Sequence, residues 1–456
     1  MRQFLHAAQA LLPEGWARDV AVEIAAGRIV AVRPGAPADA AAERVGVLLP
    51  AIANLHSHAF QRAMAGMTER RGPDPRDSFW TWRRLMYRFL DRLTPDDVEA
   101  IAAQVQMEML EAGYAALAEF HYLHHGPGGA RYDNLAEMSE RVVNAAAETG
   151  IGLTLLPVLY EQGGCDGRAL AAGQLRFGND LNGFVALLEA AGASLGRLPG
   201  DAVLGVAPHS LRAVSRASLA AAAALRPAAP LHLHLAEQVA EVDEVCAVYG
   251  ARPVAWLMAN AAVDGRWCLI HCTQMEPEET TRLAASGAVA GLCPITEANL
   301  GDGIFDGARY LAAAGRFGVG SDSNIRISLS EELRSLEYSQ RLRDRGRALL
   351  AAPDRSTGRV LYTGAAAGGA QAAGRAAGAI APGNWADLLT LDPNHLELAG
   401  RQGDDLLDAW IFAADDRVVD RVWAAGRPVV AAGRHVKHAA ITARYRKVLA
   451  RLRERL

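Results

Sequence analysis

Four histidines and one aspartate each stand at the end of a short apolar run: His56, His58, His234, His271 and Asp322. Apolar runs of this length, alternating with longer helical stretches, are typical of buried parallel strands. Because alternate side chains share one face of a strand, His56 and His58 can reach the same ion. In a barrel of parallel strands, the active site lies where the carboxyl ends of the strands meet. The sequence therefore predicts an α/β fold, a (β/α)8 TIM-type barrel with a divalent metal site at one end.

Each of these residues also has an ordinary structural explanation. A single histidine in an apolar run is usually a hydrogen-bonded core residue, and this is our interpretation of His232, with a supporting role at the site as the alternative. The carboxylate of Asp322, between two serines, suits the start of a helix. Five candidate groups that all follow strand-like runs argue against coincidence. Glu237, three positions after His234, is then expected beside the metal.

Composition indicates a large enzyme. The 456 residues are 51% hydrophobic and 21% charged, which is enough for a sizeable core and leaves no sign of global disorder. The net charge of −4 and the absence of a basic stripe with aromatic residues disfavour a nucleic-acid partner. No apolar run approaches the roughly 20 residues of a membrane span, and the first residues do not resemble a signal peptide. We expect a cytoplasmic protein whose five cysteines are reduced thiols.

The two ends of the chain have a different character from its middle. Residues 1–50 contain short alternating strands, and residues 381–440 return to strands and hairpins with turns at glycine. Between them, residues 51–380 alternate strands with helices. We expect the two ends to form one smaller β-sandwich domain beside the barrel. Residues 441–456 are expected to form a packed amphipathic helix.

The barrel elements can be placed from pattern alone. The clearest helix begins at Thr94 and Pro95, with a hydroxyl cap and proline in the first turn, and stops at Gly113. An Ala- and Gly-rich stretch, 364–383, is expected to be a short helix that closes the barrel. The sequence predicts eight strands. The first begins near residue 48, and the other seven span 115–120, 151–159, 203–207, 231–235, 268–270, 289–293 and 317–320.

The order of these groups resembles the amidohydrolase superfamily, in its deaminase branch with a single metal. That branch has His-x-His after the first strand, His after the fifth with a nearby Glu, His after the sixth and Asp after the eighth. The resemblance covers essentially the whole chain and sharpens toward the formimidoylglutamate deiminases. The segments that carry this closer resemblance are FWTWR at 79–83, APHSLR at 207–212, HLAEQ at 234–238 and GSDSNIR at 320–326.

The resemblance implies hydrolysis of N-formimino-L-glutamate to N-formyl-L-glutamate and ammonia, a step of bacterial histidine degradation. It implies one divalent metal, for which zinc is expected, although iron, nickel or manganese accept the same donors. The metal would activate a water molecule, Asp322 would take a proton from it, Glu237 would relay a proton to the departing nitrogen, and His271 would stabilise the tetrahedral intermediate. The implied metal ligands are His56, His58, His234 and Asp322.

A dicarboxylate substrate requires cationic donors of fixed geometry, and arginine suits bidentate carboxylate binding. Arg83 and Arg212 stand where the family has such arginines, although either could instead form a surface ion pair. Gln61, Tyr122 and His209 match further family positions and would donate hydrogen bonds to the substrate. The superfamily resemblance also implies a homodimer.

Two other functions remain open. The same chemistry could deaminate a purine or pyrimidine ring, although a neutral ring would not need two arginines. An inactive barrel that binds a metal or a small acid is the other alternative, and the retained Glu237, His271 and Asp322 speak against it. No metal-bridging lysine follows the third strand, which disfavours a two-metal site. The segment 293–301 is assigned no catalytic role.

Overall fold

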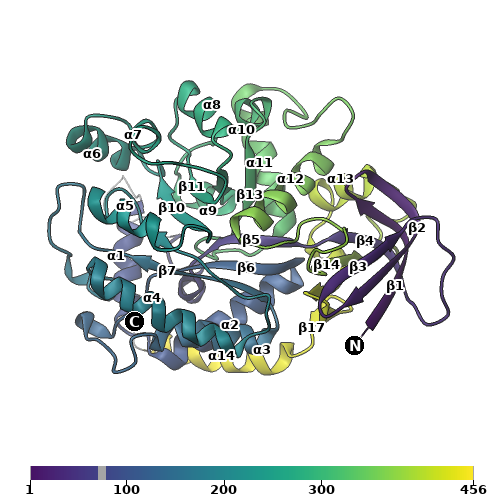
Figure 1. Ribbon diagram of the computed structural model, residues 1–456, viewed down its shortest axis with the longest axis horizontal. Helices are drawn as coiled ribbons and strands as arrows, with labels where there is room; N and C mark the ends of the chain where they lie inside the picture. The colour runs from purple at the N-terminus through teal and green to yellow at the C-terminus, as the bar shows by residue number, and fades with distance from the viewer. Residues whose placement is uncertain (1, 70–78, 455–456) are drawn as a thin grey trace.

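The computed structural model describes residues 2–69 and 79–454, apart from the side chains of a few residues at the start of helix α1 (Figure 1). Strands from both ends of the chain form one eight-stranded sheet in the order β17-β16-β15-β14-β4-β1-β2-β3. β4 links the two ends, because it pairs in parallel with β1 and antiparallel with β14. The strands are β1 Arg2–Leu12, β2 Gly15–Ala25, β3 Arg28–Arg33, β4 Glu43–Pro50, β14 Leu388–Leu391, β15 Val419–Ala424, β16 Arg427–Ala431 and β17 Arg434–His435.

The middle of the chain forms a curled parallel sheet. It consists of two hydrogen-bonded groups, β5-β6-β7-β8, with β9 also on β7, and β10-β11-β12-β13. Parallel bridges between Val206 and Leu231 and between Ser57 and Asp322 join the edges of the two groups. The strands are β5 Ile52–Ser57, β6 Tyr114–His121, β7 Gly152–Leu159, β8 Val203–Leu204, β9 Ala207–Pro208, β10 Leu231–Leu235, β11 Trp267–His271, β12 Val289–Leu292 and β13 Arg316–Val319.

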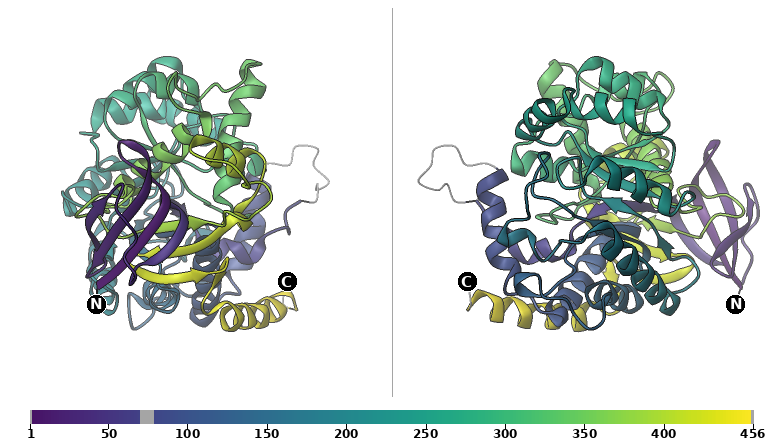
Figure 2. Two further views of the ribbon diagram at one scale, coloured as in Figure 1. Left: turned by 90° about the vertical axis from the view of Figure 1, so that its right-hand side faces the viewer. Right: turned by 60° about the vertical axis from the view of Figure 1, so that its left-hand side comes forward.

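Helices follow these strands and cover the curled sheet, and the β sheet of the chain ends lies to one side (Figures 1 and 2). Among the described residues, no helix is both long enough and apolar enough to cross a membrane. The α-helices are α1 Phe79–Leu90, α2 Pro95–Glu111, α3 Glu137–Thr149, α4 Leu181–Ser194, α5 Arg216–Leu225, α6 Val239–Tyr249, α7 Pro253–Asn260, α8 Pro277–Ala285, α9 Pro294–Leu300, α10 Gly307–Ala312, α11 Leu329–Asp344, α12 Thr357–Ala372, α13 Asp404–Phe412 and α14 His438–Arg453. The 3-10 turns are η1 Ala59–Met64, η2 Pro127–Gly129, η3 Ala172–Gln174, η4 Leu195–Arg197 and η5 Asp416–Val418.

The helix predicted from Thr94 is confirmed as α2. The Thr94 side chain accepts a hydrogen bond from the Asp97 backbone N–H, and the Asp97 carboxylate accepts one from the Thr94 N–H in return. This reciprocal cap satisfies two amides at the helix start that have no partner within the helix. Gly113 then takes a positive φ of 100°, which only glycine adopts without strain, and β6 begins at the next residue.

Several predicted boundaries were wrong. The run from residue 48 is two strands, since β4 ends at Pro50 in the sheet of the chain ends and only β5 belongs to the curled sheet. The fourth strand is divided at Gly205. The helix expected at 364–383 is α12, which starts and ends earlier, and the terminal helix α14 begins three residues earlier than expected. The glycines of α12 have a packing role, because a Cβ at Gly368 would overlap the backbone oxygen of Phe317 in β13.

A buried ion cluster joins the sheet of the chain ends to the curled sheet. Arg375, after α12, contacts Asp387 Oδ2 through Nε and Asp201 Oδ2 through Nη2, both at 2.7 Å. Arg427 of β16 also contacts Asp201 Oδ2, at 2.8 Å. Asp387 Oδ1 accepts a hydrogen bond from the Ala425 N–H. The side chains of Arg375, Asp201 and Asp387 are almost fully buried, so each charge depends on its partners.

Arg375→Ala should lower the free energy of unfolding by about 3–5 kcal/mol, because it leaves two buried carboxylates without their shared cation. Denaturant unfolding followed by circular dichroism measures this change. Arg355→Ala is the matched control, since Arg355 pairs with Asp354 at an exposed site and its loss should cost about 1 kcal/mol or less. Equal effects of the two substitutions would contradict a supporting role for the buried cluster.

Candidate active site

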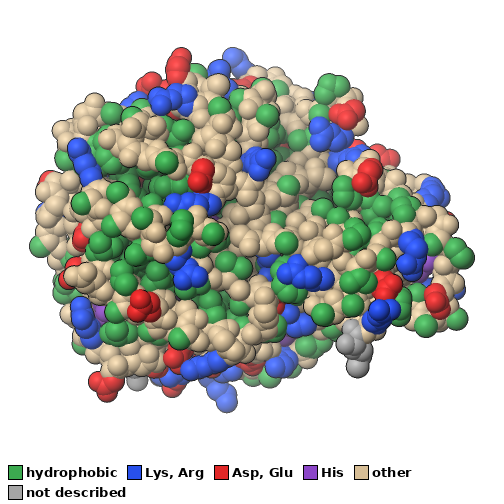
Figure 3. Space-filling view, in the orientation of Figure 1, with side chains coloured by type: hydrophobic (Ala, Val, Ile, Leu, Met, Phe, Trp, Pro, Cys, Tyr) green, Lys and Arg blue, Asp and Glu red, His purple; other side chains and the backbone are tan. Residues whose placement is uncertain are grey.

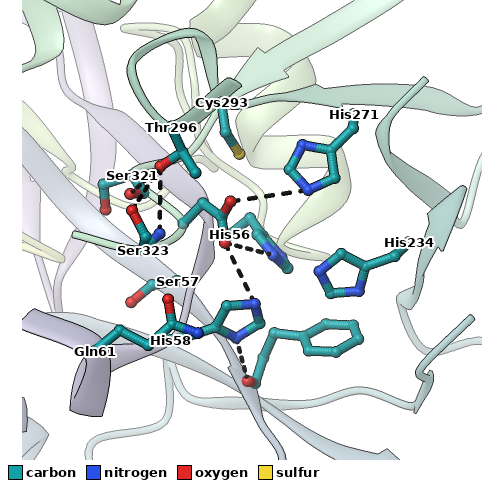
Figure 4. A network of polar contacts seen from close by, with 12 residues as sticks. His56, Ser57, His58, Gln61, His234, His271, Cys293, Thr296, Ser321 and Ser323 are labelled. Atoms are coloured by element: carbon teal, nitrogen blue, oxygen red, sulfur yellow. Dashed lines mark hydrogen bonds and ion pairs between the residues drawn. The ribbon is translucent and has the colours of Figure 1, made fainter. Parts of the chain in front are cut away.

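Four predicted ligands come together at the carboxyl end of the curled sheet, and the three histidines among them are labelled in Figure 4. His56 lies in β5 and His58 directly follows it, His234 lies in β10, and Asp322 follows β13. One ligand atom from each residue lies within 4.8 Å of those of the other three, and all four residues are buried. Asp322 Oδ1 is 3.5 Å from His56 Nε2 and 3.3 Å from His58 Nε2. These residues are distant in the sequence but meet in the structure, because the carboxyl ends of parallel strands lie at the same edge of the sheet.

Backbone carbonyls orient two of the imidazole rings. His58 Nδ1 lies 3.0 Å from the Phe120 carbonyl oxygen, and His234 Nδ1 lies 3.2 Å from that of His209. A carbonyl only accepts hydrogen bonds, so Nδ1 must carry the proton in each ring. The lone pair on Nε2 is then free to bind a cation, an arrangement that is common among metal-binding histidines.

The protonation states of this cluster fit a divalent cation. Burial lowers the pKa of His56 to about 3 and also lowers those of His58 and His234, so the three rings are neutral. Burial by itself would raise the pKa of Asp322, but His56 and the charge of His271 hold it well below its ordinary value. His56 Nδ1 has no hydrogen-bond partner among the described residues. Three neutral imidazoles and one carboxylate are a donor set that zinc accepts.

Glu237 and His271 adjoin the four ligands. His271 Nε2 is 3.9 Å from Glu237 Oε1 and 3.8 Å from Asp322 Oδ2. Glu241 holds the turn after β10, because its carboxylate accepts hydrogen bonds from the N–H groups of Ala236 and Glu237. Burial raises the pKa of Glu237, whereas the pKa of His271 is raised against the effect of burial by the charge of Glu237 and by a hydrogen bond to a second glutamate. A buried carboxyl group and a buried imidazole thus face the same space.

That second glutamate is Glu297, which the sequence had not singled out. Glu297 Oε1 is 3.2 Å from His271 Nδ1 and accepts a hydrogen bond of 2.9 Å from the Cys293 backbone N–H. The segment 293–301, to which no role was assigned, therefore orients His271. The sequence offers no signal for this role, because a glutamate on a short helix such as α9 is ordinary.

A polar network behind the site supports Asp322. Asn54 Nδ2 donates to Ser321 Oγ at 2.8 Å, and Ser321 Oγ donates to Asn324 Oδ1 at 2.6 Å. Asn324 Nδ2 in turn lies 3.2 Å from the His58 carbonyl oxygen. These bonds tie the loop of Asp322 to the strand of the first two histidines. Asn54, a polar residue inside an apolar strand, was the sequence signal for this network.

A cavity opens beside the four ligands, and most of the predicted substrate residues line it. Gln61 Nε2 donates to the Tyr122 hydroxyl at 2.8 Å. Arg212 follows β9 and is only 7% exposed, so its charge is aimed into the protein. Arg83 lies outside the side chains that the structure describes, and His232 is a core residue that donates to the Ala372 carbonyl. The cavity is lined by His58, Gln61, Trp82, Met86, Tyr87, Tyr122, Tyr160, Phe177, His209, Arg212, His234, Glu237, His271, Leu300, Asp322 and Ser323.

The fold and the site define a class of protein. The family model described as Amidohydrolase family matches residues 47–429, and the chain therefore belongs to this family. A second model, formimidoylglutamate deiminase HutF, N-terminal domain, matches residues 2–46. The chain is 53% identical over 434 residues to the formimidoylglutamate deiminase of Pseudomonas aeruginosa, covering 94% of this chain and 95% of that protein. Among the amidohydrolases, it belongs with the formimidoylglutamate deiminases.

Other proteins are similar to the chain in sequence or in fold. The 8-oxoguanine deaminase of Pseudomonas aeruginosa is 29% identical over 417 residues, covering 88% of this chain and 86% of that protein. A crystal structure of an amidohydrolase from Brucella melitensis matches with a TM-score of 0.95 and 48% identity, covering 99% of both chains. An adenosine deaminase from Xanthomonas campestris, solved with bound zinc, matches with a TM-score of 0.81 at 22% identity over 99% of this chain and 98% of that one.

Proposed function

We propose that this protein hydrolyses N-formimino-L-glutamate to N-formyl-L-glutamate and ammonia, as a step of histidine degradation. The observation that carries the proposal is the pairing, in one cavity, of the buried His and Asp cluster with the buried Arg212. The cluster suits hydrolysis of a C–N bond, and the arginine suits a substrate carboxylate. The similarity to the Pseudomonas aeruginosa formimidoylglutamate deiminase supports the same reaction.

His56, His58, His234 and Asp322 are the proposed ligands of one divalent metal, for which we propose zinc. When bound, the metal supplies a Lewis acid that lowers the pKa of a water molecule. The neutral imidazoles and the ionised carboxylate support this assignment, because ligands bind a cation in those protonation states.

The proposed chemistry then depends on three side chains of the chain. Asp322 accepts a proton from the attacking water, whose oxygen forms a bond to the formimino carbon. Glu237 passes a proton to the terminal nitrogen, and the bond between that nitrogen and the carbon breaks. His271 stabilises the charge that develops on the oxygen. Both protons of the water end on the departing ammonia, so the step balances without a further reactant.

The remaining cavity residues are proposed to hold the amino-acid part of the substrate. Arg212 and Arg83 would each bind a carboxylate, because a guanidinium group offers two parallel N–H donors. Gln61, Tyr122 and His209 would hydrogen-bond the formimino group or the substrate backbone. The hydrogen bond from Gln61 to Tyr122 supports this, since it fixes both side chains at the cavity wall.

We also propose a more detailed architecture. The parallel bridges at both edges of the curled sheet support a closed (β/α)8 barrel for residues 51–380. Residues 1–50 and 381–440 would form a β-sandwich, supported by the close approach of the turns at Gly27 and Gly426 as the eight-stranded sheet curls. Residues 441–456 would form the terminal helix. A homodimer in the cytoplasm is the expected form of the enzyme.

A second candidate function is deamination of an aromatic ring. The 8-oxoguanine deaminase relative and the rings of Tyr122, Tyr160 and Phe177 at the cavity favour it. Ammonia release from N-formimino-L-glutamate, guanine, cytosine and 8-oxoguanine separates the two. We expect release from the formimino acid alone. Release only from a ring would overturn the substrate assignment, and binding without any release would indicate an inactive barrel.

Chelation should remove the activity, and about one equivalent of zinc per chain should restore it, because the water-activating group is lost with the metal. The measurement is ammonia release before and after dialysis against a chelator, with metal content determined alongside. His56→Ala should not recover, whereas the control His395→Ala, at a histidine paired with Glu397 away from the cavity, should recover fully. Full activity of metal-free protein would contradict a metal-dependent reaction.

A further inference from the structure

We infer a second, inhibitory cation site next to the proposed metal site, formed by His271, Cys293 and Glu297. One ligand atom from each of these residues lies within 4.8 Å of the other two, and all three residues are buried. A thiolate, an imidazole and a carboxylate together suit zinc and chemically similar divalent ions such as cobalt and cadmium. The proposed catalytic metal does not use any of these three residues.

The geometry needs little adjustment to accept a cation. Glu297 Oε1 is 3.2 Å from His271 Nδ1, close to the separation of two ligand atoms around one zinc ion. Cys293 directly follows β12 and carries its thiol beside the His271 ring (Figure 4). Cys293 is a free cysteine, so its sulfur is not used in a disulfide. In the structure, the same groups are held together by the hydrogen bonds of Glu297.

A cation at this site must displace two protons. Burial raises the pKa of the Cys293 thiol, so the S–H bond breaks as the bond from sulfur to the metal forms. The N–H bond of His271 Nδ1, which faces Glu297, breaks as the bond from that nitrogen to the metal forms, and both protons leave to solvent. The four-ligand site offers one more donor atom than the second site and contains no thiol. We therefore expect the second site to fill only after the first.

Occupation of the second site should inhibit the enzyme. His271 Nε2 is 3.8 Å from Asp322 Oδ2 and 3.9 Å from Glu237, so the ring lies between the two sites. A cation bound to this ring replaces its hydrogen bond to Glu297 and fixes its position. The expected inhibition rests on the proposed function, whereas the existence of the site does not.

Cobalt titration of the metal-free protein tests the site directly. The first equivalent should give no thiolate-to-cobalt charge-transfer band, because the four-ligand site contains no sulfur. A second equivalent should produce that band in the near ultraviolet, and ammonia release should fall about a hundredfold relative to the protein with one equivalent, the scale of losing one group that stabilises the developing charge. Equilibrium dialysis counts the bound ions at each stage.

Cys293→Ser, or Cys293→Ala if serine is not tolerated, should remove both the band and the inhibition by excess cobalt. Cys268→Ser is the matched control, since Cys268 is a buried thiol of the same apolar cluster outside the donor set, and it should keep both. For each variant, ammonia release with one equivalent of cobalt is compared with ammonia release by the same variant in excess cobalt.

Binding of a single equivalent at millimolar cobalt, or a band that survives in Cys293→Ser, would overturn the second site. The experiment distinguishes failure of the second site from failure of the proposed function, because the charge-transfer band and the count of bound ions require no substrate. A second equivalent with the band, but no ammonia from N-formimino-L-glutamate at one equivalent, would leave the site in place and overturn the proposed function.

Discussion

Glu237→Gln should lower kcat for N-formimino-L-glutamate by about 10²- to 10⁴-fold, the range typical of a lost general acid or base. Glutamine keeps the size of the side chain and its place 3.9 Å from His271 Nε2, but it carries no transferable proton. Glu237 does not belong to the four-ligand cluster, so metal content should not change. The measurement is steady-state ammonia release together with metal analysis of the same sample.

Glu244→Gln is the control for this variant. Glu244 lies on α6, a few residues further along the chain, where it is half-buried, pairs with the exposed Arg168 and accepts a hydrogen bond from the Cys165 N–H. Its substitution should change kcat by less than about threefold, in line with the small energies of exposed ion pairs. If Glu237→Gln turned over at the parent rate with a full complement of metal, another group would have to carry the proton.

Arg212→Met should reduce kcat/KM for N-formimino-L-glutamate by about 30-fold to about 5,000-fold, which corresponds to about 2–5 kcal/mol, the cost of truncating one partner of a buried charge pair. Methionine preserves much of the apolar stem of the side chain and removes the guanidinium group that would bind a substrate carboxylate. Arg212 is nearly buried at the cavity, and against the effect of burial the charge of Glu241 raises its pKa, so it is charged. Arg212→Lys should fall between the parent and the methionine variant, because one ammonium replaces a two-pronged donor.

Formamidine distinguishes carboxylate binding from general damage to the site. This small amidine has the reacting group but no carboxylate, so the parent and Arg212→Met should hydrolyse it at similar, low rates. Arg216→Met is the control for loss of a nearby cation, because Arg216 packs over the ring of Tyr249 and does not line the cavity. An equal loss on both substrates would assign Arg212 a structural role instead.

Much of the curled sheet was predictable because its strands are buried on both faces and therefore apolar throughout. The runs at β6, β7, β10 and β11 lie where the sequence predicted strands, within one or two residues. The run before His56 was harder to divide, since both halves are equally buried in different sheets. An apolar run indicates that a strand is buried, but it does not indicate which sheet the strand belongs to.

The residues of the candidate site also fall into two groups, those that the sequence could predict and those that it could not. The proximity of His56, His58, His234 and Asp322 was predictable, because the carboxyl ends of parallel strands share one edge of a sheet. Glu297 was not, since a glutamate on a short helix after β12 is ordinary in sequence and acquires its meaning only at 3.2 Å from His271. Asn54 and Asn324 likewise matter through hydrogen bonds to residues that are distant in the chain.

The sequence by itself determined the types of side chain at the site, the strands that carry them and the class of reaction they can perform, because local residue patterns encode strand ends and donor chemistry. Only the tertiary structure decided which polar groups meet: that Glu297 orients His271, that Glu241 holds the turn of Glu237, and that Arg375 joins the two sheets. The contacts of Arg375 join residues far apart in the chain, whereas Glu241 and Glu237 are only four residues apart, and the energy of every one of these contacts depends on burial and on distances of a few ångströms. A linear pattern contains neither quantity.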